Sequence, residues 1–401
     1  MSTAGGARTP SLVLLVVVLG LVIAWTSLVQ ANPRDARRSA EPTASYGGPT
    51  ALGREPGVER HKFSRPLYWP TSAVWTSALG RDLLVVDVLQ DRLLLSSSEG
   101  DLAELPETMS AARTLAHPSQ VRSSGEFIWV EDEAQDTVTV FDRESLALVR
   151  QIRIEETRFE SPDGDSSERL DVIYDWIPVS NGLLVFGDAE RSDAESEETS
   201  WSMVLAFLGP DGSADVVRRF PISWPERQRY KESLRYFAEA AGSGFVLLFG
   251  DQTQVLKVDP AGNVTELVTL PEELTDSVSP TVPRAAGLDG PARATRFYRN
   301  IEEADRVLYG LYGAGDKLFL LLRERYAATS LATWELVPVD PRSGSLGPSV
   351  LVPSRAPHLG VVPGESSWAL IEKSGVEGVP PYEAPFMQSL SLAVFRPAPA
   401  G

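Results

Sequence analysis

Acidic residues recur at the ends of short apolar stretches, which is where a repeating sheet could bring carboxylates together. They are Asp87, Asp132, Asp188, Asp251, Glu324 and Glu372. A cleft lined by one sign of charge focuses its field and would attract a cation or a basic peptide. Alternatively, each acid accepts hydrogen bonds from the backbone of its own turn, as aspartate commonly does. Recurrence in successive units favours this structural role.

Two of the three histidines occupy similar places in the chain. His117 stands ahead of the segment Gly125–Trp129 (GEFIW), and His358 stands ahead of Gly364–Trp368 (GESSW). Imidazole titrates near neutral pH and could serve as a metal ligand or as a base. A structural histidine at the start of a strand is the favoured interpretation. The third, His61, lies ahead of the first repeat.

The motifs of known catalytic centres are missing. There is no cysteine, so disulfides, thiolate zinc sites and cysteine nucleophiles are excluded, and neither Gly-x-Ser-x-Gly nor a Walker-type phosphate loop occurs. Asp163–Tyr174 begins like a calcium loop, but Glu168 stands where glycine is required and Tyr174 where glutamate is required. We therefore assign no catalytic residue, no metal ligand and no cofactor.

Ligand-binding candidates remain at the strand ends and strand starts. They are His117, Asp132, His358, Asp87, Asp188 and Asp251. Calcium is the divalent cation that a ring of carboxylate oxygens would take. Whether the protein is an enzyme stays open, with a non-catalytic protein favoured.

Composition limits the class of protein and the kind of partner. The chain has 401 residues, of which 43% are hydrophobic, which is enough to bury a core. Its net charge is -18, whereas binding to a phosphate backbone needs clustered lysine and arginine. Nucleic acid is therefore excluded as a partner.

The amino terminus carries an export signal or a membrane anchor. Leu12–Ala24 is uninterruptedly apolar, and Val29-Gln30-Ala31 suits cleavage before Asn32. The apolar stretch extends to Val29, close to the roughly 20 residues that span a bilayer, so an uncleaved anchor is the alternative. We expect residues 1–31 to be a signal peptide or signal anchor, and residues 32–62, rich in Pro, Gly, Ala, Ser and Arg, to be a flexible tether.

Residues 125–154 are the clearest copy of a repeated unit of three short strands with tight turns. Asp87, Gln90 and Asp91 match Asp132, Gln135 and Asp136 at a constant spacing of 45 positions. Further copies carry Phe-Gly-Asp at 186–188 and at 249–251, and Asp-Pro turns followed by glycine at 259–262 and 340–344. Six units of about 54 residues fit a radial propeller with four-stranded antiparallel blades.

The predicted propeller spans residues 63–397. We expect Ser389–Arg396 to pair with an outermost strand at Phe63–Tyr68, which would join the terminal blades and cover an open edge. Residues 155–171, 189–200 and 272–306 break the repeat and are predicted to be loops. Helical spacing predicts a short helix over residues 225–241, followed by a strand.

The run Val138–Leu146 (VTVFDRESL), echoed by Val-Asp at 258–259 and 339–340, resembles the six-bladed β-propellers of bacteria grouped around NHL-repeat proteins. The resemblance implies that the first strand of each blade lines a central channel and that second strands end around its mouth. Members of this group bind proteins, peptides or sugars, or act as metal-dependent lactonases. Lactonases of this type need asparagines at the metal, and only Asn181 lies near a channel-lining strand.

Together these observations predict an exported protein, periplasmic or on the outer face of the cytoplasmic membrane, which binds a protein, peptide or glycan at one face. It would contact the membrane through its amino-terminal segment if that segment is uncleaved. One alternative is a metal-dependent hydrolase or lactonase with a divalent cation at the channel mouth. Another is a structural subunit of an envelope complex, with residues 272–306 as its contact.

Overall fold

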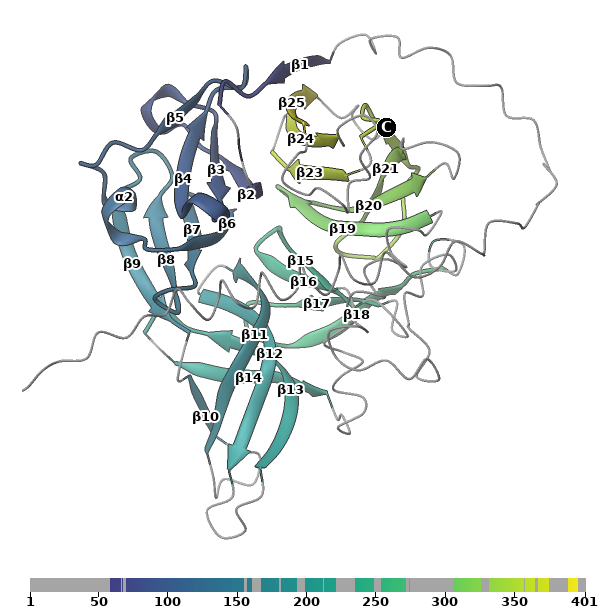
Figure 1. Ribbon diagram of the computed structural model, residues 1–401. Coiled ribbons are helices and arrows are strands. Elements are labelled where there is room, and N and C mark those ends of the chain that lie inside the picture. Colours follow the sequence, from purple (N-terminus) through teal and green to yellow (C-terminus); the bar gives the residue numbers. More distant parts are fainter. Residues whose placement is uncertain are drawn as a thin grey trace, which may run out of the picture. The chain divides into compact units, whose positions relative to one another are not determined.

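Six antiparallel sheets follow one another along the chain (Figure 1). The computed structural model describes residues 58–65, 67, 70–154, 157–160, 167–179, 182–192, 199–211, 213–220, 235–248, 254–271, 274, 306–325, 332–356, 358–364, 367–374 and 389–395. Five of the sheets have four strands and the third has five. The predicted all-β fold with four-stranded antiparallel blades is confirmed, with the third blade enlarged.

Each blade is one sheet, numbered in chain order. Blade 1 contains β2 (Pro70–Trp75), β3 (Leu83–Asp87), β4 (Arg92–Ser96) and β5 (Leu102–Glu104), and blade 2 contains β6 (Pro118–Ser124), β7 (Phe127–Asp132), β8 (Thr137–Asp142) and β9 (Leu148–Arg153). Blade 3 contains β10 (Arg158–Glu160), β11 (Ser167–Val179), β12 (Gly182–Ser192), β13 (Thr199–Leu208) and β14 (Ala214–Phe220). Blade 4 contains β15 (Arg235–Ala240), β16 (Ser243–Leu248), β17 (Gln254–Val258) and β18 (Val264–Thr269).

Blade 5 contains β19 (Arg306–Ala314), β20 (Lys317–Arg325), β21 (Ala332–Val339) and β22 (Val350–Val352). Blade 6 contains β23 (His358–Val362), β24 (Trp368–Ser374), β25 (Ser389–Phe395) and β1 (Glu59–Lys62). The helical turns η1 (Ala78–Gly80) and η2 (Val88–Gln90) and the helix α2 (Ser110–Thr114) lie in connections. A helix with the length and apolar character of a membrane span does not occur among the residues described.

The core lies between consecutive blades. Side chains of β3 alternate between two faces, yet Leu83–Val86 are all fully buried, so both faces are covered. Five hydrophobic clusters fill the successive boundaries from blades 1 and 2 to blades 5 and 6. A sixth cluster packs Leu83 and Leu94 of blade 1 with Ile371 and Leu392 of blade 6. The blades therefore form a closed ring, which is a six-bladed propeller.

The first strand of a blade is innermost, except in blade 3, where β11 and not the extra strand β10 takes this place. β2 contacts β6 and β23, β6 contacts β11, and β15 contacts both β11 and β19. Their approach is close at blades 4 and 5, where a Cβ on Gly313 would lie 1.7 Å from the carbonyl oxygen of Glu239. Side chains on these strands are consequently the ones that the ring brings together at its axis.

The ring is closed by a strand from the amino-terminal end of the domain, as predicted. β1 pairs antiparallel with β25, with Glu59 opposite Val394 and Lys62 opposite Ser391. The strand covers 59–62 and not the predicted 63–68, so the sheet begins inside the range expected to be tether. Pairing in blade 6, which hides the edge of β25, accounts for this position.

Three sequence-based predictions need correction. Within 225–241, residues 235–240 form β15, because pairing with β16 outweighs a weak helical spacing; residues 225–234 lie outside the described chain. The loops predicted at 155–171 and 189–200 are shorter, because β10 and parts of β11, β12 and β13 fall inside them. Of the insertion 272–306, residue 274 and Arg306, where β19 begins, are described.

Candidate functional site

Asp132, the last residue of β7, is fully buried and accepts several hydrogen bonds. Its carboxylate receives the backbone N–H groups of Ala116 (2.6 Å), His117 (3.1 Å) and Ala134 (3.1 Å) and the side-chain amide of Gln135 (2.9 Å). It thereby ties its own turn to the chain that enters blade 2. This is the turn role expected of a recurrent aspartate.

The equivalent acids of blades 1 and 3 are also fully buried. Asp87 ends β3 and lies 3.5 Å from the guanidinium of Arg92, and Asp188 of β12 accepts a 2.5 Å hydrogen bond from the hydroxyl of Tyr174. These two carboxylates, like that of Asp132, are covered by protein, so a ligand could reach them only by displacing a protein partner. A direct ligand contact stays a prediction for all three.

The acids predicted for blades 4, 5 and 6 have three different outcomes. Asp251 lies outside the described residues. In blade 5 the side chain of Glu324 is exposed, whereas its neighbour Arg323 is buried, with 1% of its surface exposed. One step along an antiparallel strand reverses the side that a residue faces, so Glu324 is not the counterpart of Asp132. Glu372 of β24 is buried and takes part in ring closure.

The strand-end face, defined as the side on which β3 and β7 end, carries solvent-accessible charge. The Nδ1 atom of His117 contacts the carboxylate of Asp91, and its Nε2 atom lies 3.8 Å from Glu133. The side chains of Asp91 and Glu133 are 57% and 60% exposed, and that of His117 is 25% exposed. This group joins the β3–β4 turn, the β7–β8 turn and the entry to blade 2.

The second predicted histidine lies on a neighbouring innermost strand. His358 is the first residue of β23, where its backbone is paired with Lys373. β23 and β6 both contact β2, so one blade separates His358 from His117. A contribution of His358 to binding stays a prediction.

An arginine that no sequence pattern indicates joins three blades at the axis. Arg122 of β6 donates from Nη2 to Asp175 of β11 (2.8 Å) and from Nη1 to the carbonyl oxygen of Phe237 in β15 (3.3 Å). Its guanidinium also lies over the ring of Trp176, 5.5 Å from the centroid. Arg122 occurs in one unit only and its partners are far away in sequence, so no repeat signal could have indicated it.

A partly buried carboxyl group lies beside this ion pair. Burial raises the pKa of Glu131, and hydrogen bonding to Trp176 and to the hydroxyl of Ser119 (3.1 Å) partly opposes the effect. The nearby carboxylates of Glu133 and Asp175 raise the pKa further. The carboxyl group of Glu131 therefore binds its proton more tightly than an exposed glutamate does.

Blade 3 is enlarged on the strand-end face. Past the pair formed by Asp188 and Met203, β12 and β13 continue for four more pairs, ending at Ser192 opposite Thr199. The start of β11 accompanies them and is covered by the extra strand β10. In blade 2 the equivalent hairpin ends at Asp132 opposite Thr137. We call this added part of blade 3 the blade 3 extension.

Ion pairs hold the blade 3 extension together. Glu168 of β11 is buried and contacts Arg219 of β14, which also donates to the hydroxyl of Ser202 in β13 (3.2 Å). Arg169 of β11 pairs with Glu190 of β12 at 2.7 Å. β10 also contacts β14, so the extension curls on itself. These contacts give it a defined shape.

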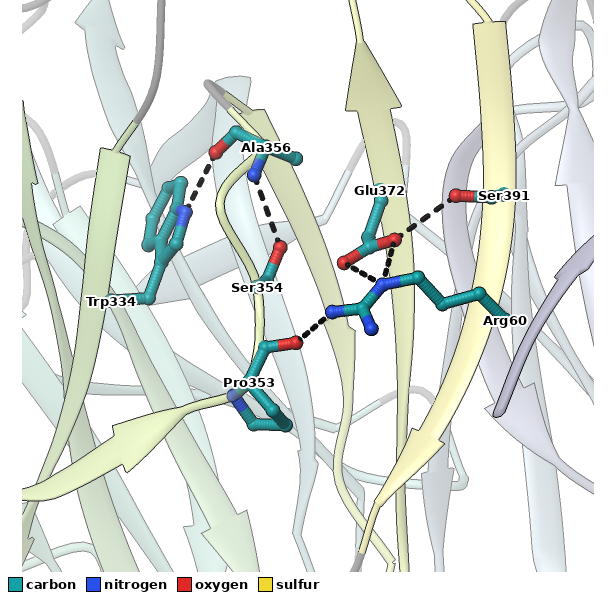
Figure 2. Close-up of polar contacts among 7 residues, drawn as sticks. All are labelled: Arg60, Trp334, Pro353, Ser354, Ala356, Glu372 and Ser391. Atoms are coloured by element: carbon teal, nitrogen blue, oxygen red, sulfur yellow. Dashed lines mark hydrogen bonds and ion pairs between the residues drawn. The ribbon is translucent and has the colours of Figure 1, made fainter. Parts of the chain in front are cut away.

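Ring closure has its own polar site, shown in Figure 2. The Nε atom of Arg60 in β1 lies 3.2 and 3.1 Å from the two carboxylate oxygens of Glu372, and the hydroxyl of Ser391 donates to the same carboxylate at 3.0 Å. Arg60 also donates through Nη2 to the carbonyl oxygen of Pro353, in the connection from blade 5. In the same connection, the carbonyl oxygen of Ala356 accepts a hydrogen bond from the indole N–H of Trp334 (2.8 Å).

Metal-binding geometry is not evident in the described part of the chain. No group of three or more histidine, aspartate or glutamate side chains among those residues is arranged to hold an ion. Asp175, on the innermost strand β11, has the guanidinium of Arg122 as its counterion.

Comparisons with known proteins give distant structural likenesses. No protein-family model matches the chain, and no curated protein matches its sequence. The streptogramin B lyase structure is 7% identical with a TM-score of 0.38, over 84% of this chain and 97% of that one. A candidate exported protein from Bacteroides fragilis is 8% identical (TM-score 0.42; 84% and 94% covered), and a candidate 6-phosphogluconolactonase from the same organism is 12% identical (0.32; 82% and 85%). The fold assignment rests on the sheets and on the clusters between them.

Proposed function

We propose that this protein is a non-catalytic, extracytoplasmic propeller that binds a protein or peptide ligand on the strand-end face, against the blade 3 extension. The observation that supports this most directly is the extension itself. Ring closure requires only the boundaries between blades, and the pairs beyond Asp188 lie past the level at which the matching hairpin of blade 2 ends. Structure beyond that needed for closure is the usual place for function on a repeated scaffold.

The charge of the strand-end face indicates the chemistry of the ligand. Asp91, Glu133 and Asp136 are exposed there, and the whole chain carries a net charge of -18. An acidic surface raises the local concentration of cations and speeds association with a basic partner. A basic peptide segment is therefore the ligand class that this face would favour.

A glycan is the less favoured ligand. Sugar recognition commonly uses aromatic rings that are open to solvent, because stacking needs an exposed ring face. Among the tryptophans whose side chains are described, Trp75 is half-buried, and Trp129, Trp176, Trp334 and Trp368 are at most 2% exposed. They fill the boundaries between blades, so they provide no stacking platform.

The axis argues for binding over metal-dependent hydrolysis. A divalent cation at the innermost strands would need free carboxylates, but the guanidinium of Arg122 lies 2.8 Å from Asp175. A fixed positive charge beside the acid repels a metal ion and lowers its affinity. The hydrolase alternative has no comparable observation in its favour.

Export is part of the proposal and rests on the amino-terminal sequence. The apolar run Leu12–Ala24 and the Pro- and Gly-rich segment after it suit a signal or anchor followed by a tether. We place the propeller on the outer side of the cytoplasmic membrane, released or attached. Protease accessibility of the domain in intact cells and in opened cells tests this placement.

The binding proposal is tested with a labelled oligolysine peptide as probe and an oligoglutamate peptide as its control. The double variant Asp91→Asn/Glu133→Gln removes two charges from the strand-end face, and asparagine tolerates the left-handed backbone of residue 91 (φ 50°). We expect fluorescence anisotropy to show oligolysine binding that weakens about tenfold in this variant.

A matched control separates a site from general attraction. Glu126→Gln/Glu144→Gln removes two exposed charges from blade 2 at the end opposite to the strand-end face. If both double variants lose affinity equally, the attraction is unspecific and the proposed face is wrong. Stoichiometric calcium or zinc in the purified protein, lost in Asp132→Asn or His117→Ala, would instead favour the hydrolase.

A further inference from the structure

The segment Val58–Arg65 contacts both of the blades that meet at ring closure. On blade 6, β1 pairs with β25 and Arg60 bonds to Glu372 (Figure 2). On blade 1, the N–H of Ser64 donates to Gly100 (2.9 Å), its hydroxyl accepts from Leu102 (2.8 Å), and Arg65 lies 3.0 Å from Glu104. One short segment therefore spans the boundary.

The contacts of this segment with blade 6 and with blade 1 differ in strength, because the ion pair on blade 6 is more buried than the one on blade 1. The side chain of Glu372 is 7% exposed and that of Arg60 is 34% exposed. Arg65 and Glu104 are 52% and 63% exposed, which is typical of surface pairs that add little. A buried carboxylate that loses its cation is left with an uncompensated desolvation cost. Arg60 and Glu372 are thus the contact that decides whether β1 stays in place.

β1 is also connected differently from the other outermost strands. β5 and β9 follow the third strands of their own blades through tight turns, closed by hydrogen bonds such as Ser97 N to Asp101 O (3.0 Å). β1 has no such turn, because residues 312 positions away in sequence hold it. The four residue pairs with β25, the ion pair with Glu372 and the hydrogen bond to Pro353 can separate without breaking a turn of another blade.

We propose that β1 is a releasable latch: separation of Arg60 from Glu372 frees β1 from β25 and uncovers the outer edge of blade 6, while blades 2 to 5 stay folded. Release exposes the edge of β25, whose Leu392 and Ala393 are buried in the closed ring. A pull or a binding event on the chain ahead of Val58 acts first on this latch, because β1 is the first strand among the described residues. Uncovering of the edge of blade 6 is thereby coupled to the amino-terminal connection.

Hydrogen exchange of the full chain, followed by mass spectrometry, tests the latch. In Arg60→Met we expect amides of β25 and β24 to exchange about tenfold faster, with blades 2 to 5 unchanged. Arg65→Met is the matched control, since it removes an arginine from the same segment and only an exposed pair. The double variant Arg60→Met/Glu372→Gln should recover part of the protection, because no carboxylate remains unpaired.

A crosslink makes the test independent of whether Arg60→Met folds well. The chain contains no cysteine, so Glu59→Cys/Val394→Cys places one pair of thiols on opposed residues of β1 and β25. Oxidation should slow exchange in β25 of the otherwise native chain and reduction should restore it. The latch is wrong if exchange in Arg60→Met rises equally in all six blades, or if oxidation leaves β25 unchanged.

Discussion

Arg122 and Asp175 form an ion pair between the innermost strands of blades 2 and 3, with Nη2 and Oδ1 separated by 2.8 Å. Their side chains are 20% and 17% exposed. Arg122→Met leaves Asp175 without its counterion, so we expect a loss of about 1–3 kcal/mol in the free energy of unfolding. Urea denaturation measures this loss.

The exposed pair of Arg65 and Glu104 is the control for that experiment. Arg65→Met should cost less than about 0.5 kcal/mol, because solvent screens an exposed pair. A double-mutant cycle with Asp175→Asn isolates the coupling of Arg122 to Asp175. A coupling energy near zero would show that the axis does not depend on this pair.

Glu131 should make stability fall as pH rises. Burial raises the pKa of its carboxyl group in the folded protein above the ordinary value of about 4.3, so the folded state binds the proton more tightly. Its contribution is present at low pH and is lost as pH rises through the folded-state pKa. Glu131→Gln should therefore stabilise the protein at pH 7 by on the order of 1 kcal/mol, and much less at pH 4.

Thermal melts of the wild-type protein and of Glu131→Gln at pH 7 and pH 4 measure this difference in stability. Glu126→Gln is the matched control, because Glu126 is an exposed glutamate of the same blade. It should change the melting temperature little at either pH. An equal stabilisation by Glu131→Gln at both pH values would contradict the proposed cause.

The aspartates of the turns between third and fourth strands should have the opposite effect. The hydroxyl and the N–H of Ser145 lower the pKa of Asp142, the side chain of Asn263 lowers that of Asp259, and the N–H of Arg342 lowers that of Asp340. Each contribution is present above the ordinary aspartate pKa and is lost as pH falls through the lowered value. Asp142→Ala should therefore lower the melting temperature at pH 7 and have less effect at pH 3.

Leu79 is an exposed leucine in a left-handed backbone conformation, with φ 55° and a side chain that is 61% exposed. Leu79→Gly removes the steric cost of this conformation, and little buried apolar surface is lost because the side chain is exposed. We therefore expect the free energy of unfolding, measured by urea denaturation, to rise by about 0.5–1 kcal/mol. The adjacent Gly80, at φ 68°, provides the converse: Gly80→Ala should destabilise by about 1 kcal/mol. Destabilisation by Leu79→Gly would show that the side chain makes an energetically important contact.

The repeat could be predicted from sequence because the backbone conformation of its turns requires particular residue types. Asp91 and Asp136, 45 positions apart, have φ values of 50° and 49°, a conformation that aspartate tolerates better than most residues. The turn aspartate Asp142 accepts the N–H groups of Glu144 and Ser145. Local geometry of this kind selects particular residue types, so it leaves a readable pattern.

The candidate site was less predictable because it depends on contacts between distant residues. Arg122 is one of many arginines in the sequence, and only the ring brings it to Phe237, 115 positions away. The blade 3 extension is rich in charged residues. In a sequence such residues indicate a loop, because the ion pairs that they form in the sheet cannot be recognised there. The sequence predicts Glu324 as the residue of β20 that faces the ring of acids, but Arg323 is the buried one. A shift of one residue along a strand exchanges the two faces of the sheet, and composition does not reveal such a shift.

Ring closure between residues 59–62 and 389–395 also sets the order in which the chain can fold. The strand that completes blade 6 is synthesised first, and its partner is synthesised last. Blades 2 to 5 can form from local contacts as the chain emerges, but the last boundary must wait for nearly the whole polypeptide, and the closure of so long a loop is entropically slow. Until then the edge of β25 has no partner, so newly made chains are most exposed to aggregation in the interval between completion of blade 6 and arrival of β1.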